Sequence, residues 1–469
     1  MKALSILKYL LLFYCLWILQ NPLFSQHWIQ KGSSASIEEA LDIAADGSGN
    51  IYTTGYFSST IDFNGTTVST NGSSDMFLVK TNSNGGIDWV VNGGGPGTDR
   101  GNSVTVDGSG NVIVTGFFNG TATFGSTTIT SSGAQDVFVA KYNANGTLQW
   151  VISAGGNGAD IANGIGVDNA GNVVVAGQFS GSSTFGSTTL TSLNGSIDIF
   201  VMKVSSAGVI SWAKQGAGKF EDRALAVSCD NAGNSYITGQ FSDTLTIDQT
   251  HNNLMMNAIF VLKLNGSGAE QWFNRIGGGS YNIAYDIVSD GSGNSYITGD
   301  FQGNLTFFGT PPTALTGTEN YKIFIAKYNS SGSLQWATSS ASSNEISSRS
   351  IDIDGSGNSY ITGYFECDFD DYKAEYGPAI FTSIGNEDIF IAKYSSSGSF
   401  DKAQQFGNRS NAFANGITLS NTNKPVIAGS FKGNINITTS TNFLATNLSL
   451  WTEVNCNAST YCGDRKSVV

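Results

Sequence analysis

Six tryptophans recur along the chain at nearly even spacing, and each is followed 18 residues later by an aspartate. The tryptophans are Trp28, Trp89, Trp150, Trp212, Trp272 and Trp336, and the aspartates are Asp46, Asp107, Asp168, Asp230, Asp290 and Asp354. A seventh copy keeps the frame with Lys402 and Ser420 in the two places, and successive aspartate positions up to Ser420 are 61, 61, 62, 60, 64 and 66 residues apart. So regular a period predicts one supersecondary unit copied seven times.

Each unit has the pattern of four short strands, which we call A to D in chain order. In the second unit they are expected at 102–106, 112–118, 136–142 and 148–151, where β-branched and aromatic residues alternate with Gly/Asn/Asp turns. No sustained helical period is present between residues 27 and 457. Four antiparallel strands repeated seven times predict an all-β fold, a seven-bladed β-propeller of four-stranded antiparallel blades.

The two ends of the repeat array are incomplete in a complementary way. Trp28 belongs to a D strand that no A to C strands precede. The last unit has an A strand near 416–419, a B strand near 425–431 and a C strand near 448–455, but no clear D strand. We therefore expect residues 27–30 to complete the seventh blade, which would join the chain ends and leave no exposed sheet edge.

Two repeated features are expected to build the core. A small residue, a glycine and a tryptophan recur between strands C and D, as in Ala140, Gly146 and Trp150; the glycine suits a positive-φ turn, and the indole is expected to be buried between blades. The longer insertion between strands B and C carries an apolar residue eight positions past the B-strand glycine in six units: Phe63, Phe124, Phe185, Ile247, Phe307 and Ile437.

Two other repeated features are expected to be structural. Lysines recur in strand C of the six intact units, and six equivalent lysines around a ring cannot serve one active site: Lys80, Lys141, Lys203, Lys263, Lys327 and Lys393. Each is expected to meet the turn aspartate or loop carbonyls at the same edge. The Asp-Gly-Ser-Gly-Asn turns are expected to be Asx turns; a calcium loop at 352–356 is the alternative, although no glutamate closes it.

Composition limits the classes of partner. The net charge is −13 and charged residues make up 13% of the chain. An acidic chain without a basic run lacks the electrostatic footprint of a nucleic-acid binder, so no nucleic-acid partner is expected. The cysteines do not follow the repeat: Cys229 is expected to be an inert buried thiol, and Cys456 and Cys462 to be able to bridge in an oxidising compartment.

The N-terminal residues 1–26 have the pattern of a secretory signal, with Lys2 and Lys8 before an apolar run at 9–19. Cleavage near Ser25 would leave a propeller domain at 27–457 that is secreted or on the cell surface, with no transmembrane segment; a retained anchor is the alternative. The tail 458–469 ends in a run that resembles a translated sequencing adapter, so we expect either a chain cut short or a short disordered tail.

The repeated patterns Asp-Gly-Ser-Gly-Asn-x-Tyr-x-Thr-Gly-x-Phe, Asp-x-Phe-x-x-Lys-Tyr and Gly-x-x-x-Trp resemble the SBBP family of bacterial β-propeller repeats over roughly residues 28–455. The resemblance implies a propeller that is secreted or surface-exposed, often with appended sorting or adhesive domains. It implies no defined biochemical activity.

The D–A and B–C loops are expected to share one face of the propeller, and they vary most between units, so a ligand is expected there. The candidate binding residues on the D–A loops are Asp99, Arg100, Asp160, Asp222 and Arg223. The alternative is that these groups hydrogen-bond their own loop ends. In the sixth unit, Asp368, Asp370, Asp371 and Glu375 could gather around a cation or form a solvated acidic loop.

Signatures of catalysis are poor. The two histidines, His27 and His251, lack metal-ligand spacing, and no nucleophile or phosphate-binding motif is present, so we expect no catalytic residues, no metal site and no cofactor. We expect a monomeric binding or scaffold module for a protein or glycan. The alternatives are a carbohydrate-active enzyme whose loop carboxylates converge, and a structural spacer in a larger adhesin.

Overall fold

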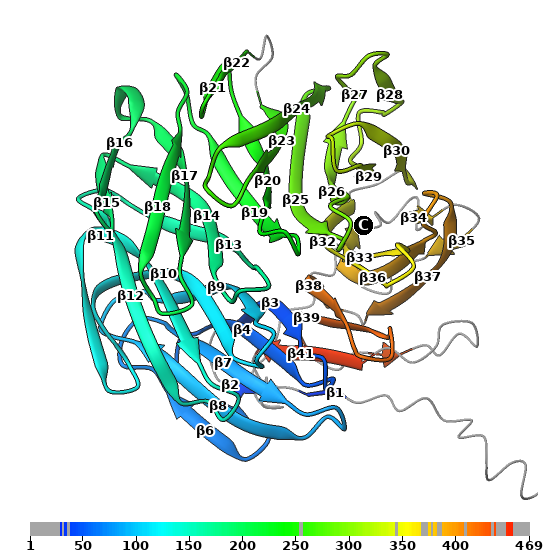
Figure 1. The fold of residues 1–469 in the computed structure, drawn as a ribbon. Helices are drawn as coiled ribbons and strands as arrows, with labels where there is room; N and C mark the ends of the chain where they lie inside the picture. Colours follow the sequence, from blue (N-terminus) through cyan, green and yellow to red (C-terminus); the bar gives the residue numbers. More distant parts are fainter. Residues whose placement is uncertain are drawn as a thin grey trace, which may run out of the picture.

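The computed structural model describes residues 29–30, 32–34, 38–252, 257–342, 346–366, 374–376, 379–381, 387–407, 410–432, 436–437 and 447–453. Within these ranges the protein is all-β, as expected, and its helical content is the short 3-10 helix η1 (Leu193–Gly195). Successive sheets follow one another around a common centre (Figure 1). The architecture is that of a propeller-like repeat protein.

The second unit shows how one sheet is built. Its strands β9 (Arg100–Val106), β10 (Val112–Phe124), β11 (Thr127–Tyr142) and β12 (Leu148–Gly156) pair in chain order, and every pairing is antiparallel. Each contains the strand predicted for it. Strands β10 and β11 run past their expected ends because the B–C insertion continues both as a hairpin beyond a register shift at Asn119.

The same antiparallel order of A, B, C and D strands recurs in five other units: β3 (Glu38–Ala45), β4 (Ile51–Phe57), β7 (Asp75–Thr81), β8 (Ile87–Gly94); β13 (Ile161–Val167), β14 (Val173–Ser180), β17 (Ile197–Val204), β18 (Ile210–Gly216); β19 (Arg223–Cys229), β20 (Ser235–Phe241), β23 (Ala258–Leu264), β24 (Glu270–Gly278); β25 (Tyr281–Ser289), β26 (Ser295–Gln302), β29 (Lys322–Tyr328), β30 (Leu334–Ser339); and β32 (Ile346–Ile353), β33 (Ser359–Glu366), β36 (Glu387–Tyr394), β37 (Phe400–Gly407). The predicted repeat of four strands is confirmed in these units.

The B–C insertions connect neighbouring sheets. β15 (Ser182–Phe185) forms a hairpin with β16 (Thr188–Thr191) and also pairs with the end of β12 in the preceding sheet. Equivalent pairs are β5 (Thr60–Phe63) and β6 (Thr66–Ser69) on β2 (Gly32–Ser34), the extension of β10 on β8, β27 (Leu305–Phe307) and β28 (Thr313–Leu315) on β24, β34 (Ala374–Tyr376) and β35 (Ala379–Phe381) on β31 (Ala341–Ser342), and β40 (Asn436–Ile437) on β37. In the fourth unit β21 (Thr244–Thr246) and β22 (Thr250–Asn252) reach Ala217 through a single bridge. Each insertion thus pairs with the outer strand of the preceding sheet.

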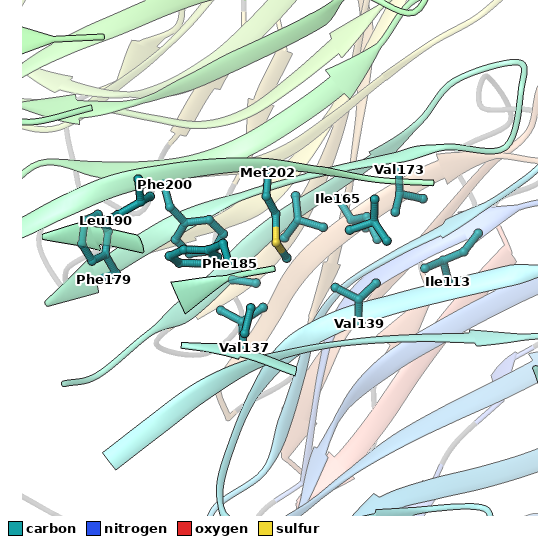
Figure 2. Packing of buried hydrophobic residues seen from close by; sticks show 14 residues of the cluster. Ile113, Val137, Val139, Ile165, Val173, Phe179, Phe185, Leu190, Phe200 and Met202 are labelled. Atoms are coloured by element: carbon teal, nitrogen blue, oxygen red, sulfur yellow. The ribbon is translucent and has the colours of Figure 1, made fainter. Parts of the chain in front are cut away.

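The hydrophobic core lies between adjacent sheets. Figure 2 shows one cluster, in which Val137 and Val139 of the second sheet meet Phe185, Phe200 and Met202 of the third. The predicted insertion anchors belong to these clusters: Phe63, Phe124, Phe185 and Phe307 are buried, and Ile247 packs against its cluster from the edge. The side chain of Ile437 is outside the described residues.

The tryptophans join neighbouring sheets but are only half-buried, which corrects the expectation of full burial. Each indole N–H donates to a carbonyl in the next unit's C–D turn at 3.0–3.2 Å, the donors being Trp89, Trp150, Trp212, Trp272 and Trp336. Each ring lies against that turn's glycine, where a Cβ would come within 2.6–3.1 Å of it. The rings remain partly exposed because they lie over the edge of the next turn, whereas the phenylalanines fill the space between the sheets.

The last sheet departs from the pattern. β38 (Ala412–Leu419) and β39 (Pro425–Lys432) are antiparallel as expected, but β41 (Asn447–Glu453) runs parallel to β39. The expectation of antiparallel pairing throughout is therefore wrong for this sheet. A parallel neighbour requires a crossover connection that returns the chain to the end of the sheet where the first strand began. One insertion strand, β40, is described here where the other units have a hairpin. β1 (Ile29–Gln30) and β2 pair with β41, also in parallel.

Candidate functional site

The three predicted acids, Asp99, Asp160 and Asp222, are fully buried. The Asp99 carboxylate accepts the Gly95 N–H at 2.7 Å, and Asp160 accepts the Gly156 N–H at the same distance. Asp99 and Asp160 therefore hydrogen-bond the start of their own D–A loops, as in the alternative interpretation given under the sequence analysis.

Each of these acids lies beside a second carboxylate, from the start of a C strand. A Cβ on Gly94 would lie 2.7 Å from Asp75 Oδ1 and 2.8 Å from Asp99 Oδ2, so the two carboxylates flank this glycine. Burial is the main cause that raises the pKa of both Asp75 and Asp99 to about 6. Asp136 and Asp160 flank Gly155 in the same way, and Asp198 acts on Asp222.

Asp222 has the most perturbed environment of the three. Its Oδ1 accepts the Ser242 N–H at 3.0 Å, and its Oδ2 has no hydrogen-bond partner among the described residues. Burial, and then the neighbouring Asp198, raise its pKa to about 8. A carboxyl of this kind is largely protonated at neutral pH, and without solvent access it does not reach a ligand on the surface.

The two predicted arginines begin β9 and β19 and occupy equivalent pairing positions, but their surroundings differ. Arg223 Nη2 donates to the Glu221 carboxylate at 2.8 Å on the surface. The Arg100 guanidinium lies 4.0 Å above the Tyr56 ring centre, and no ion pair of the described residues includes it. In both arginines the buried Nε has no hydrogen-bond partner among the described residues. The five predicted residues thus lie at three successive D–A loops rather than together in one site.

The acidic loop of the sixth unit gives no further information. Asp368, Asp370 and Asp371 lie outside the described residues, and of Glu375 only its place in β34 is described.

The inner A strands β3, β9, β13, β19, β25, β32 and β38 line one central cavity of about 760 Å³. Neighbouring A strands contact one another along the whole series, and β38 also contacts β3. At the same place in each of these units a β-bulge interrupts the pairing between strands A and B. A bulge turns one extra side chain to a new direction, and the extra residues line the cavity: Leu41, Asn102, Asn163, Leu225, Tyr285, Arg349 and Asn415.

Three of the bulge residues are asparagines that connect neighbouring A strands. Asn102 Nδ2 donates to the Ala162 carbonyl at 2.8 Å, and Asn163 Nδ2 donates to the Ala224 carbonyl at 2.8 Å. Asn415 makes the equivalent bond, to the Ala40 carbonyl at 2.9 Å. The A strand β38 is therefore bonded to β3 in the same way as β9 is bonded to β13.

Arg349 is the centre of an aromatic cluster at the D–A and B–C end of the cavity. Its guanidinium lies 4.1 Å from the Tyr285 ring centre, and Nη2 donates to the Tyr364 hydroxyl at 2.7 Å. Tyr364 in turn packs edge-on against Phe413, and the Tyr285 hydroxyl is 3.1 Å from that of Tyr281. Asp300 acts electrostatically on Arg349, but its carboxylate accepts hydrogen bonds from Ser347 and Ser348 and forms no ion pair with the arginine.

The aromatic cluster continues across the first and last units to Arg100. Asn415 Nδ2 also donates to Glu39 Oε1 at 3.0 Å, and the Tyr56 hydroxyl donates to Glu39 Oε2 at 2.9 Å. Tyr56 carries Arg100 on its ring face. We call the resulting set the arginine–tyrosine arc: Tyr285, Arg349, Tyr364, Phe413, Asn415, Glu39, Tyr56 and Arg100.

Deeper in the cavity, acids bond the backbone of the neighbouring A strand. Asp42 Oδ2 accepts the Val104 N–H at 2.9 Å, and Asp286 Oδ2 accepts the Ile351 N–H at the same distance. Burial raises the pKa of Asp42 to about 6 and that of Asp286 to about 7. Cys229 lines the cavity and is half-buried rather than fully buried as expected. Desolvation raises the pKa of its thiol to about 12, which keeps it protonated and supports the expectation of an inert residue.

Sequence reasoning found Arg100 and missed the rest of the arc. Tyr56 and Tyr364 occupy the variable position of the Thr-Gly-x-Phe pattern in strand B. A position that changes in an otherwise constant motif was the available signal. The bulge residue that lines the cavity has no signal of its own, because a bulge depends on the pairing of two strands.

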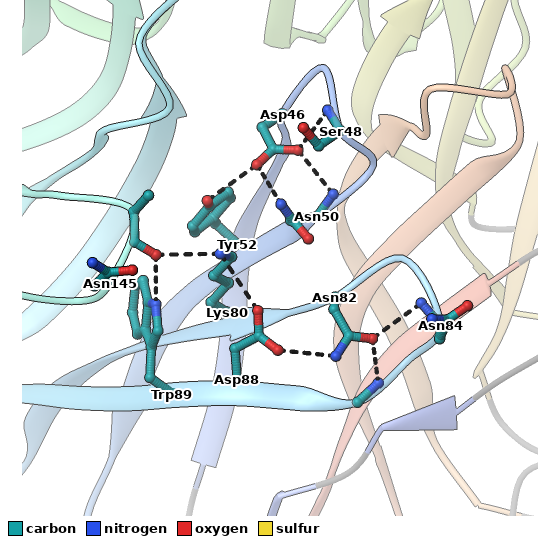
Figure 3. A network of polar contacts seen from close by, with 12 residues as sticks. Asp46, Ser48, Asn50, Tyr52, Lys80, Asn82, Asn84, Asp88, Trp89 and Asn145 are labelled. Carbon is teal, nitrogen blue, oxygen red and sulfur yellow. Dashed lines mark hydrogen bonds and ion pairs between the residues drawn. The ribbon is translucent and has the colours of Figure 1, made fainter.

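The opposite face, made of A–B and C–D turns, is occupied by its own contacts. Figure 3 shows Asp46 accepting hydrogen bonds within its turn, while Lys80 Nζ reaches the Ala144 carbonyl at 3.2 Å and Asp88 at 3.4 Å. In other units the lysine meets the turn aspartate, as in Lys141 with Asp107 at 2.8 Å and Lys203 with Asp168 at 2.9 Å. The expected partner, a turn aspartate or a loop carbonyl, is confirmed for Lys80, Lys141, Lys203 and Lys263. Lys393 instead pairs with Asp401, and Lys327 lies over the Tyr296 ring.

No protein-family model matches the sequence. The chain is similar to an uncharacterized WD repeat-containing protein of Acanthamoeba polyphaga mimivirus, at 23% identity over 86% of this chain. It spans 36% of that protein's length. A protein of unknown function from Bacteroides caccae aligns in three dimensions with a TM-score of 0.37 and 11% identity, over 70% of this chain and 89% of that one. Together with the sheets described above, the WD repeat relative supports a repeat protein of the β-propeller kind. Among the described residues no helix is long and apolar enough to cross a membrane.

Proposed function

We propose that the chain is a seven-bladed β-propeller of the SBBP type that acts as a binding or scaffold module, secreted or held at the cell surface. A protein or glycan partner would meet the face made of D–A and B–C loops. The resemblance of the repeats to that family and the signal-like residues 1–26 support this assignment.

Closure of the ring is supported by three observations. Strand β38 contacts β3, Asn415 bonds Ala40 as Asn102 bonds Ala162, and β1 and β2 pair with β41 in the sheet of β38 and β39. A closed ring would hold the loops of one face in fixed positions around the cavity, which is the geometry that propeller binding modules use.

The single observation that carries the choice of face is the arginine–tyrosine arc, since the opposite face is occupied by its own Asp, Lys and Trp contacts. Of the three exposed large apolar side chains among the described residues, two lie on this face and the third, Val209, lies on the opposite one. Leu193, on a B–C loop, is 46% exposed and Phe220, on a D–A loop, is 43% exposed. A carbohydrate-active enzyme has less support, because the three predicted loop acids are buried and two of them, Asp99 and Asp160, are hydrogen-bonded to their own loops.

A binding screen with face-directed variants tests this proposal. The purified domain is applied to glycan and peptide arrays, and Leu193→Asp and Phe220→Asp are compared with Val209→Asp, a 63% exposed residue on a C–D turn of the opposite face. We expect the first two variants to weaken the array signal and the third to leave it unchanged. If Val209→Asp alone removed the array signal, the binding site would lie on the opposite face, which is made of A–B and C–D turns. Release of sugar products from the glycans would favour the alternative of a carbohydrate-active enzyme.

A further inference from the structure

We infer that the arginine–tyrosine arc is a binding site for an acidic saccharide, with Arg100 and Arg349 receiving its carboxylate or sulfate groups. This inference rests on the proposed function, because it names the ligand class of the same face.

The charge of the two arginines is unusual for its surroundings. The chain has a net charge of −13, yet both guanidiniums line the cavity without an ion pair among the described residues. The adjacent acids have other partners, since Glu39 accepts from Tyr56 and Asn415 and Asp300 accepts from Ser347 and Ser348. A guanidinium in this state has donors available for an anionic oxygen.

Both arginines are held in place before a ligand arrives. Arg100 stacks on Tyr56 at 4.0 Å, and Arg349 is held by Tyr285 at 4.1 Å and by its bond to Tyr364. A side chain that is already ordered loses less entropy when it binds. The stacking also leaves the edges of the guanidiniums, where the N–H donors lie, to meet an anion.

The other groups at this end of the cavity favour a saccharide over a peptide. The polar groups of the kind that bond sugar hydroxyls are the hydroxyls of Tyr281 and Tyr285 and the side-chain carbonyl oxygens of Asn102, Asn163 and Asn415, whose Nδ2 groups already donate to the protein. Each described A strand pairs in its sheet only with its B strand, so its inner edge carries no other described strand. Side chains of neighbouring units already bond part of that edge, as at the N–H groups of Val104, Ile351 and Leu419. Fewer backbone groups therefore remain for an added peptide strand.

The experiment measures affinity by calorimetry for oligosaccharides that carry uronate, sialate or sulfate groups, each beside its neutral parent. We expect at least one acidic oligosaccharide to bind, with its neutral parent at least tenfold weaker and the affinity falling as salt is raised. Arg100→Gln and Arg349→Gln should each weaken binding at least tenfold. Arg223→Gln is the matched control, because it occupies the equivalent strand position but pairs with Glu221 away from the cavity.

Several results would overturn the inference. They are equal affinity for acidic and neutral forms, binding that survives both Arg100→Gln and Arg349→Gln, binding of acidic peptides alone, or binding of none of the probes. Melting temperatures of the two variants separate loss of binding from loss of folding, and Arg100→Lys and Arg349→Lys should restore part of the affinity if charge is the cause. A partner that is sensitive to Phe220→Asp but not to either arginine change would leave the proposed function intact.

Discussion

The indole N–H of Trp89 donates a 3.0 Å hydrogen bond to the carbonyl of Ala144, which lies in the C–D turn of the next sheet. The same bond recurs wherever this tryptophan and the turn that follows it are both described. Each pair of neighbouring sheets is thus joined near its outer edge by one aromatic ring, and the following predictions start from this contact.

Replacing a tryptophan tests how much the contact stabilises the fold. Because Trp150 is half-buried, we expect Trp150→Ala to lower the free energy of unfolding by about 2–4 kcal/mol, below the usual cost of a fully buried tryptophan. Trp150→Phe keeps most of the packing and loses the bond to the Ser206 carbonyl, so about 1 kcal/mol is expected. Chemical denaturation measures both changes, with the exposed turn substitution Ser83→Ala as the control. Equal costs for the two variants would show that packing contributes little.

Alanine substitutions at two turn glycines with the same backbone geometry distinguish the cost of backbone strain from the cost of a steric clash with a tryptophan. Gly110 and Gly146 have φ values of +77° and +78°, but a Cβ on Gly110 meets nothing within 4 Å, whereas one on Gly146 would lie 2.8 Å from the Trp89 ring. We expect Gly110→Ala to cost about 1 kcal/mol through backbone strain. Gly146→Ala should cost about 1–3 kcal/mol more, because the indole must move. Thermal melting of both variants checks this, and similar melting temperatures would contradict the docking of Trp89 on the turn.

The pKa of Asp222 makes stability depend on pH. Its folded value of about 8 lies above the usual value of 3.8, so the folded state holds the proton more tightly than the unfolded state. This contribution is fully present below about pH 4 and is lost as pH rises towards 8. We therefore expect Asp222→Asn to flatten the fall of melting temperature between pH 4 and pH 8.

Asp248 supplies the control of opposite sign. Its hydrogen bond with Lys214 lowers its pKa, so its contribution is present above the usual value and is lost as pH falls. Asp248→Asn should reduce stability at neutral pH and have little effect in acid. The Asp222 prediction fails if Asp222→Asn steepens the profile or leaves it unchanged.

The N-terminal strands are expected to stabilise the whole domain. Ile29 pairs with Leu448 and Ser33 pairs with Thr452, so deletion of residues 27–34 would remove the strands that pair with β41. We expect a lower melting temperature for the whole domain, together with a tendency to aggregate through the exposed edge. The reference is the same domain beginning at residue 27, measured by calorimetry. Unchanged melting of the shorter chain would refute closure by these strands.

Much of the fold could be read from repeated local patterns. The positive-φ glycine of each C–D turn, the Asx turn around Asp107 and the strands on either side of it depend on residues close in sequence, and the period showed that one solution serves every unit. The prediction that Lys141 meets the turn aspartate was also correct, because Asp107 and the C-strand lysine lie at the same edge of one sheet.

The candidate site could be predicted only in part. Arg100 and Arg223 look alike in sequence and begin equivalent strands, yet Arg223 pairs with Glu221 while Arg100 stacks on Tyr56 of the neighbouring unit. Arg349 was not singled out from the sequence, because a bulge directs it to the cavity and its aromatic neighbours, Tyr285 and Tyr364, come from two other strands.

The sequence by itself determined the repeating unit, its four strands and the turns between them, because these follow from backbone geometry and side-chain periodicity within about 60 residues. Only the tertiary structure decided that the insertions clasp the preceding sheet, that the tryptophans stay partly exposed, and that the loop acids lie buried while two arginines line the cavity. These outcomes depend on how one unit meets the next. A local pattern that repeats identically cannot specify which copies will differ at that contact.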